Sequence, residues 1–107
     1  MTDSIDIEAL TSLLANSTSV TLIDVRRMTD VEAVPKIIQG AAWRDPENID
    51  AWAEQLPVGK RTVVYCVKGG SVSRSVADRL KKEGLDAVFL EGGLKKWIDD
   101  DRPTEDI

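Results

Sequence analysis

The 107-residue sequence contains no histidine and only one cysteine, Cys66. The absence of histidine excludes every mechanism that depends on an imidazole base and, with a single cysteine, the common zinc sites. One cysteine also excludes an internal disulfide and a ligated metal cluster. If the protein is an enzyme, we expect Cys66, carboxylates, hydroxyls or backbone groups to carry its chemistry.

Long apolar runs are also missing. No run approaches the roughly 20 residues that span a bilayer, so we expect no membrane segment. The N-terminus has neither a basic start nor an apolar stretch, which argues against a signal peptide. A lone unpaired thiol is typical of a reducing compartment, and this predicts a cytoplasmic protein.

The composition is that of an ordinary globular protein, with 42% hydrophobic and 31% charged residues. The length fits one domain over residues 1–107. We expect a core over residues 5–98 and an acidic C-terminal tail, residues 99–107, that frays. Nothing in the sequence demands more than a monomer.

The net charge of −5 argues against nucleic acid as a general partner. The charge is uneven, because residues 60–96 carry nine basic and four acidic side chains whereas both flanking segments are acidic. Two interpretations stay open. The basic residues cluster by chance on solvated helix faces, or they create a weak positive field that favours a small anionic substrate.

Short β-branched runs alternate with amphipathic segments along the chain. The runs predict strands at 20–25, 62–66 and 86–90, with an extended segment at 40–43. The amphipathic segments predict helices at 5–15, 28–34, 45–56 and 71–83, and a short one after Gly92-Gly93. Asp45 and Gly84 have the residue types that begin and end helices. This alternation predicts an α/β domain with a mostly parallel sheet.

Cys66 ends the clearest strand and precedes a glycine-rich loop that leads into a helix. Ligands of open α/β sheets bind beyond the carboxyl ends of the strands. The loop amides, the helix dipole and Lys68 all favour an anion, and the nearest anion is the Cys66 thiolate itself. Such a thiolate needs no general base. The competing interpretation is a buried cysteine that only packs. The residues that follow Cys66 in this loop and helix start are Val67, Lys68, Gly69, Gly70, Ser71 and Val72.

Three segments of the sequence resemble the signatures of the rhodanese-like sulfurtransferases. They are Leu22-Ile23-Asp24-Val25-Arg26, Val64-Tyr65-Cys66-Val67-Lys68-Gly69-Gly70-Ser71 and Leu90-Glu91-Gly92-Gly93-Leu94-Lys95-Lys96-Trp97. The resemblance covers residues 5–98 and implies a three-layer α/β/α fold with a mostly parallel central sheet of about five short strands.

The resemblance implies a double-displacement sulfur transfer. Cys66 would take the outer sulfur of a small anionic donor such as thiosulfate, forming a covalent persulfide, and a thiol, cyanide or a protein would accept it. No metal and no cofactor beyond the persulfide are implied. The N–H groups of residues 67–71 would hold the persulfide charge. A second hypothesis is a non-enzymatic carrier that delivers persulfide sulfur to one partner protein.

Other residues have supporting roles in this interpretation. Asp24 and Arg26 are expected to brace the edge of the sheet, and Arg74 is either a solvated helix residue or a substrate contact. Ser71 is expected to cap the helix or to bond the sulfur, while Gly69 and Gly70 are expected to give the loop its backbone shape.

The sequence departs from the family pattern at three places. Met28-Thr29-Asp30 occupies the stretch where the thiosulfate-using type has a second arginine. Ser71 stands where many single-domain members carry arginine, and Lys36-Ile37-Ile38-Gln39-Gly40-Ala41 replaces the usual Gly-His-Ile-Pro-Gly-Ala. The donor preference therefore stays open. Phosphatases and arsenate reductases of the related fold need Cys-x5-Arg, and Val72 occupies the arginine position.

Overall fold

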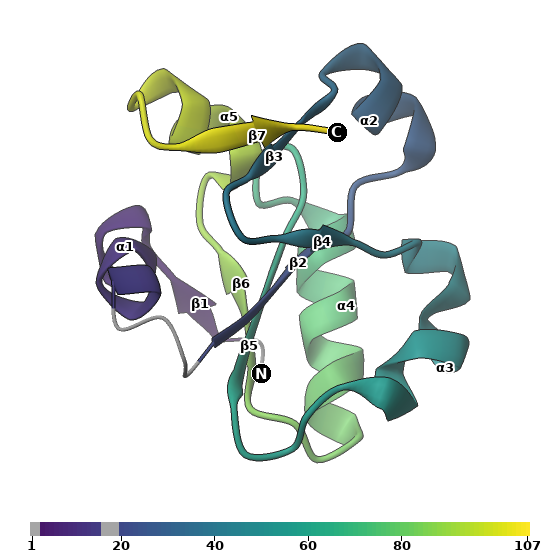
Figure 1. The fold of residues 1–107 in the computed structure, drawn as a ribbon. Coiled ribbons are helices and arrows are strands. Elements are labelled where there is room, and N and C mark those ends of the chain that lie inside the picture. Colours follow the sequence, from purple (N-terminus) through teal and green to yellow (C-terminus); the bar gives the residue numbers. More distant parts are fainter. Residues whose placement is uncertain (1–2, 16–19) are drawn as a thin grey trace.

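The computed structural model describes residues 3–15 and 20–107 (Figure 1). The helices are α1 (Ile7–Ala15), α2 (Met28–Ala33), α3 (Ile49–Trp52), α4 (Ser71–Lys82) and α5 (Gly93–Asp99). The strands are β1 (Ser4–Ile5), β2 (Val20–Asp24), β3 (Lys36–Ile38), β4 (Ala42–Trp43), β5 (Arg61–Tyr65), β6 (Ala87–Leu90) and β7 (Thr104–Asp106). Two 3-10 turns, Pro46–Asn48 and Ala53–Gln55, flank α3.

The central sheet has five strands in the order β1-β6-β5-β2-β4. Every neighbouring pair in it is parallel, so all five carboxyl ends lie at one edge. β5 is the middle strand and pairs with β2 on one side and β6 on the other. This confirms the predicted α/β class and places the end of β5 at the centre of the edge where ligands bind in such sheets.

Alternating side chains divide the core between the two faces of the sheet. On β5, Val63 and Tyr65 belong to the cluster that includes residues of α1 and α5, whereas Val64 belongs to the cluster beneath α3 and α4. Figure 1 shows α1 on one side of the sheet and α3 and α4 on the other. The three-layer α/β/α arrangement is therefore confirmed.

The ends of several elements follow from local sequence. Asp45 Oδ1 accepts a hydrogen bond from the Glu47 N–H at 2.9 Å, as expected of an N-cap. After α4, Gly84 has a φ of +88°, and the Leu85 N–H reaches back to the Leu80 carbonyl at 3.1 Å. This is a glycine-terminated helix end. The single helix predicted over 45–56 is instead three short turns, of which α3 is the middle one.

The C-terminal residues correct one prediction. Instead of fraying, β7 pairs with β3 in a separate antiparallel sheet. The Trp97 indole donates a hydrogen bond to the Pro103 carbonyl at 2.8 Å, and the Ile107 N–H donates to the Pro35 carbonyl at 3.1 Å. Backbone pairing thus orders a segment whose acidic side chains stay exposed. The expectation of a frayed tail was wrong because it considered only side-chain polarity.

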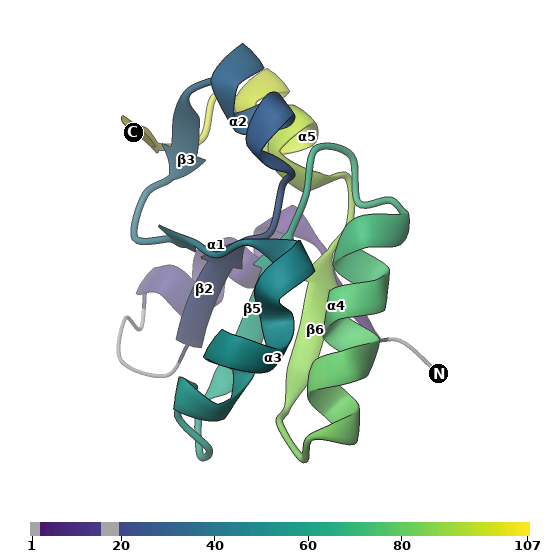
Figure 2. The ribbon, with the colours of Figure 1, turned by 90° about the vertical axis from the view of Figure 1, so that its right-hand side faces the viewer.

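Both α2 and α5 lie beyond the carboxyl ends of the central strands, where Figure 2 shows them together above β5 and β6. The loop that leaves β5 passes beside them before it enters α4. Over residues 3–15 and 20–107, no helix has the length and apolar character needed to cross a bilayer.

Candidate active site

Cys66 directly follows β5, the middle strand of the sheet. Its side chain is only 6% exposed, and it makes no disulfide because the chain has no second cysteine. Four residues, 67–70, connect it to α4, a 12-residue helix whose N-cap is Gly70. The thiol therefore lies between a strand end and a helix N-terminus, where the helix dipole favours negative charge.

The backbone N–H groups of residues 67–72 have no acceptor among the residues that the structure describes. Lys68, Gly70 and Ser71 of this run are exposed, and successive unpaired N–H groups that lead into a helix are suited to an external anion. Gly69 shapes the run, because its φ is +72° and a Cβ there would lie 2.8 Å from the Gly92 nitrogen. Gly70 has a φ of −87° and open space around it, so the predicted need for glycine holds at Gly69 alone.

One hydroxyl contacts the sulfur, and it belongs to Ser73. The Cys66 thiol donates to Ser73 Oγ at 3.2 Å, and the Ser73 hydroxyl donates to the Gly70 carbonyl at 3.4 Å. Ser73 is completely buried. Ser71 is exposed and makes no capping hydrogen bond, so its predicted capping role was wrong. The helical spacing of the sequence could have identified Ser73 as the serine that faces inward, because it shares the inward face of α4 with Val76, Ala77 and Leu80.

The start of α5 fixes the other side of the loop. The Leu94 N–H donates to the Cys66 carbonyl and the Lys95 N–H donates to the Val67 carbonyl, both at 2.9 Å. Gly93 makes this approach possible: its φ is +60°, and a Cβ there would lie 2.5 Å from the Cys66 carbonyl oxygen. The Gly-Gly turn therefore holds the backbone of the cysteine loop in place.

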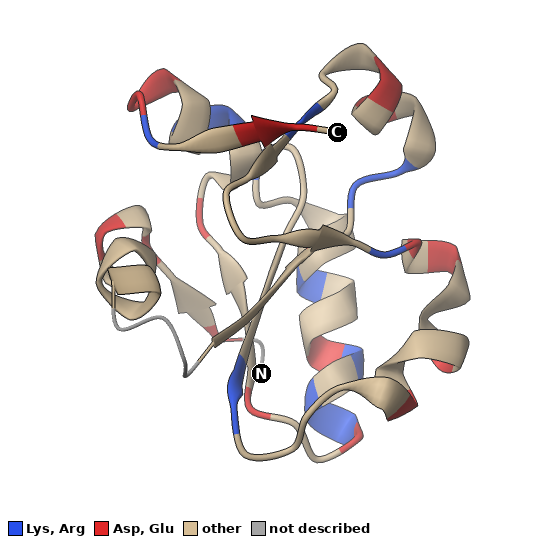
Figure 3. Ribbon diagram, viewed as in Figure 1, with Lys and Arg blue, Asp and Glu red and all other residues tan. Residues whose placement is uncertain are grey.

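Most cations of the basic segment are paired with acids, whereas Lys68 and Arg74 beside the cysteine loop are not. Figure 3 shows Lys and Arg at both ends of α4. At the far end and on neighbouring elements most cations are paired with acids, although Lys60 and Lys96 form no ion pair among the described residues. The pairs are Arg61–Asp86, Arg79–Asp50, Arg79–Glu83, Lys81–Asp3, Lys82–Asp78 and Lys95–Asp99. Within the described residues Lys68 and Arg74 form no ion pair. The solvated-face interpretation thus accounts for most of the basic segment, and two cations remain beside the loop.

Lys68 and Arg74 line one polar hollow of about 470 Å³ together with Gly69, Phe89 and Glu91. The Arg74 guanidinium lies over the Phe89 ring, 4.9 Å from its centroid, and Arg74 Nε donates to the Gly69 carbonyl at 3.3 Å. Both cations are exposed, and these two contacts restrain Arg74. The hollow therefore presents two cations next to the cysteine loop, one of them restrained by contacts with Phe89 and Gly69.

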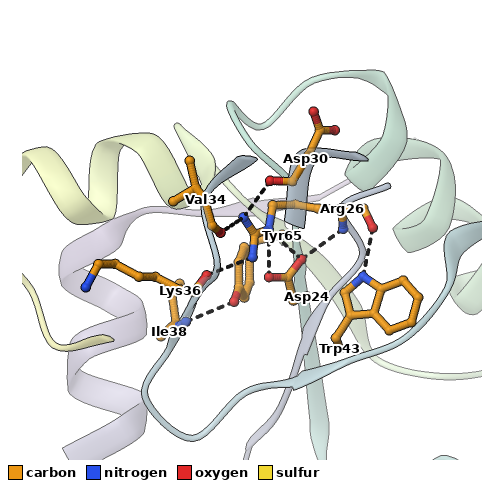
Figure 4. A network of polar contacts seen from close by, with 8 residues as sticks. All are labelled: Asp24, Arg26, Asp30, Val34, Lys36, Ile38, Trp43 and Tyr65. Carbon is orange, nitrogen blue, oxygen red and sulfur yellow. Dashed lines mark hydrogen bonds and ion pairs between the residues drawn. The ribbon is translucent and has the colours of Figure 1, made fainter. Parts of the chain in front are cut away.

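A buried ion pair braces the edge of the sheet beside this loop (Figure 4). Arg26 Nε lies 2.8 Å from Asp24 Oδ2, and the two side chains are 1% and 0% exposed. The guanidinium also donates to the carbonyls of Val34 and Lys36, at 2.9 and 2.7 Å. Arg26 therefore ties the end of β2 to the segment between α2 and β3, and it reaches no part of Cys66 in these contacts.

Tyr65, the residue before Cys66, belongs to the same network. Its hydroxyl oxygen accepts the Ile38 N–H at 3.0 Å. Burial, together with the nearby Asp24 carboxylate, raises the pKa of the Tyr65 hydroxyl. Burial also raises the pKa of Asp24 above its usual 3.8, and hydrogen bonds and charge from Arg26 oppose part of that rise. The hydrogen bonds of Arg26 and Tyr65 therefore hold the backbone of residues 34–38 against the ends of β2 and β5.

A family model for the rhodanese-like domain matches residues 6–100. The chain belongs to this family. The rhodanese-like domain is 30% identical over 98 residues to a sulfurtransferase from Allochromatium vinosum, a match that covers 91% of this chain and 89% of the relative.

Two further comparisons place the rhodanese-like domain among larger proteins. It is 37% identical over 49 residues, 46% of this chain, to a tRNA 2-selenouridine synthase from Shewanella frigidimarina, and the match spans only 13% of that protein. The structure of a thiosulfate sulfurtransferase from Pseudomonas aeruginosa superposes with a TM-score of 0.83 at 24% identity, covering 99% of this chain and 20% of the other. The second comparison shows the shared fold.

Within the rhodanese-like domain, the predicted site residues fall into three groups. Cys66 and the loop from Val67 to Val72 form the centre. Asp24 and Arg26 lie at the end of the neighbouring strand β2, and Arg74 lies at the side of the loop. Two contributors were missed. Ser73 touches the sulfur, and Gly93 allows α5 to bond the loop backbone.

Proposed function

We propose that this rhodanese-like domain is a sulfurtransferase that moves sulfane sulfur through a persulfide on Cys66. The observation that carries the proposal is the run of amides at residues 67–72, which have no acceptor among the described residues and follow the one thiol at the N-terminus of α4. Such amides stabilise a charged sulfur in the way an oxyanion hole stabilises oxygen. The sulfurtransferase relative from A. vinosum supports the same class of reaction.

The proposed reaction has two displacements. In the first, the Cys66 thiolate attacks the outer sulfur of thiosulfate, the sulfur–sulfur bond of the donor breaks, and sulfite leaves with the bonding electron pair. In the second, a thiolate or cyanide attacks the outer sulfur of the Cys66 persulfide, and the Cys66 thiolate leaves. No oxidant or reductant is needed, because each step exchanges one bond to divalent sulfur for another.

Treating the protein with thiosulfate tests the proposal directly. We expect the intact mass to rise by one sulfur atom, and cyanide to reverse the gain with release of thiocyanate. Cys66→Ser should gain nothing and transfer nothing. Thiosulfate is one donor among sulfane-sulfur compounds, so a glutathione persulfide arm is run in parallel. If neither donor adds sulfur, or if Cys66→Ser transfers sulfur like the parent protein, the proposal is wrong.

The acceptor separates an enzyme from a carrier. An enzyme should turn over many times with cyanide or a small thiol. A carrier should form the persulfide equally well and release it rapidly only to one protein. We propose the enzyme, because two cations without an ion pair among the described residues, Lys68 in the cysteine loop and Arg74 beside it, suit a small anionic donor.

Lys68→Ala should weaken thiosulfate use without preventing persulfide formation. A lysine near the protein surface contributes on the order of 1 kcal/mol to attraction of an anion, so we expect the KM for thiosulfate to rise about three- to tenfold. Lys60→Ala is the matched control, because Lys60 is also exposed but precedes β5 at the opposite end of the strand. An unchanged KM in Lys68→Ala would remove Lys68 from the donor site.

A further inference from the structure

Ser73 has no role in the reaction as described so far, although its oxygen lies 3.2 Å from the Cys66 sulfur. The hydroxyl is completely buried at the third position of α4, where the inward face of the helix points at the strand end. A buried serine on a helix face that is otherwise apolar is unusual unless its hydroxyl is bonded. Here it is bonded twice, once to the sulfur and once to the Gly70 carbonyl.

The hydroxyl carries one proton, and this limits its two contacts. While Cys66 is a thiol, the S–H donates to Ser73 Oγ and the Ser73 O–H donates to Gly70. Once the sulfur has lost its proton, it only accepts. The contact at 3.2 Å is then favourable only if the Ser73 O–H turns from Gly70 to the sulfur.

Rotation of the Ser73 hydroxyl away from the Gly70 carbonyl costs little free energy. That oxygen also accepts the Arg74 N–H at 3.3 Å, and Gly70 is exposed, so water can replace the hydroxyl. The bond gained at the sulfur is a hydrogen bond to a charged acceptor in a buried position. Such bonds are about twice as strong as bonds between neutral groups. The balance therefore favours rotation whenever the sulfur is charged.

We propose that Ser73 is a positioning residue whose hydroxyl rotates between the Gly70 carbonyl and the Cys66 sulfur, donating to the sulfur whenever it carries negative charge. This deepens the proposed function and rests on it. In the persulfide the inner sulfur is neutral and the charge lies on the outer sulfur, so the hydroxyl returns to Gly70. It turns back as the acceptor attacks and the Cys66 thiolate leaves.

The test is the rate of iodoacetamide alkylation of Cys66 as a function of pH, in the parent protein and in Ser73→Ala. Alanine keeps the helix and removes only the oxygen, and thermal unfolding checks that the variant is folded. We expect the pH of half-maximal rate to rise by about one unit in Ser73→Ala, and alkylation near neutral pH to slow about tenfold. At high pH, where the sulfur is ionised in both proteins, the rates should converge.

Ser75→Ala is the matched control, since Ser75 is an exposed serine of the same helix. It should keep the parent profile. An unshifted profile in Ser73→Ala would overturn the proposed role, and so would a variant that is uniformly slower at every pH, because this would indicate a merely structural effect.

The pH profile of alkylation does not depend on sulfur transfer. The proposed role of Ser73 and the proposed sulfurtransferase function can therefore be overturned independently of each other. Failure of the parent protein to take sulfur from either donor would overturn the proposed function even with a shifted profile. With a parent that forms the persulfide, Ser73→Ala should also release sulfur to cyanide about tenfold more slowly, because the departing thiolate loses its donor.

Discussion

Arg26→Met should be among the most destabilising single changes in this protein. The substitution leaves the Asp24 carboxylate buried without its partner, and it removes the donors to the Val34 and Lys36 carbonyls. Breaking a buried ion pair from one side costs about 3–5 kcal/mol, a large part of the 5–15 kcal/mol that typical domains possess. Urea unfolding followed by tryptophan fluorescence measures the loss.

Arg27→Met is the matched control, because the neighbouring arginine is exposed and has no ion pair among the described residues. It should change the unfolding free energy by less than about 0.5 kcal/mol. If the two variants lose similar stability, the Asp24–Arg26 pair does not brace the fold as described.

The loss in Arg26→Met should also depend on pH. Arg26 lowers the pKa of Asp24, against the larger rise that burial causes, so its removal raises this pKa further. A carboxyl whose folded pKa exceeds its unfolded value of 3.8 binds its proton more tightly in the folded state. Stability is therefore lost as pH rises above that value. The deficit relative to the parent protein should be smaller near pH 4 than at pH 7, because the lost donors to Val34 and Lys36 contribute at both.

Gly93→Ala should disrupt the cysteine loop. The new Cβ would lie 2.5 Å from the Cys66 carbonyl oxygen, 2.6 Å from that of Val67 and 2.7 Å from the Gly69 nitrogen. All three atoms are backbone, so neither helix nor loop can yield without breaking the hydrogen bonds between them. Strain at positive φ and overpacking together predict a cost of roughly 3 kcal/mol or more. Thermal unfolding measures it, and thiosulfate loading should fall with it.

Gly84→Ala separates the two contributions. Gly84 also has a positive φ, of +88°, but nothing lies within 4 Å of the position of its Cβ. This variant should lose only the cost of the left-handed conformation, about 1–2 kcal/mol. Equal losses at the two glycines would show that close packing of α5 on the loop contributes nothing.

The middle of the sheet was predictable because local pattern and tertiary environment agree there. The apolar run at 62–66 is β5, covered on both faces, and the run at 86–90 is β6. The helix predicted over 71–83 is α4, with Gly84 at its end. Cys66 was found for the same reason, since a strand end followed by a glycine-rich loop is a local signal.

The remaining features depend on contacts between distant backbone segments. β1 has two residues and is defined by pairing with β6, through the Asp3 and Ile5 carbonyls. β7 is defined by pairing with β3, although its Thr-Glu-Asp sequence has no strand pattern. The sequence marks Gly92-Gly93 as the start of a short helix, but the proximity of Gly93 to the Cys66 carbonyl follows only from the placement of α5. No local pattern encodes such contacts.

Ser71 and Ser73 show that a difference of two positions along a helix decides which serine contacts the sulfur. Both serines open the same helix, yet one is exposed and the other touches the sulfur. Counting back from Val76, Ala77 and Leu80 would have selected Ser73.

The bonds from Leu94 and Lys95 to the cysteine loop have a consequence during synthesis on the ribosome. Translation runs from the N-terminus, so Cys66 leaves the exit tunnel before Leu94 and Lys95, which fasten its loop, have emerged. The nascent thiol is then outside its finished surroundings, exposed to cellular oxidants and electrophiles. The loop reaches its finished geometry only when α5 emerges and docks.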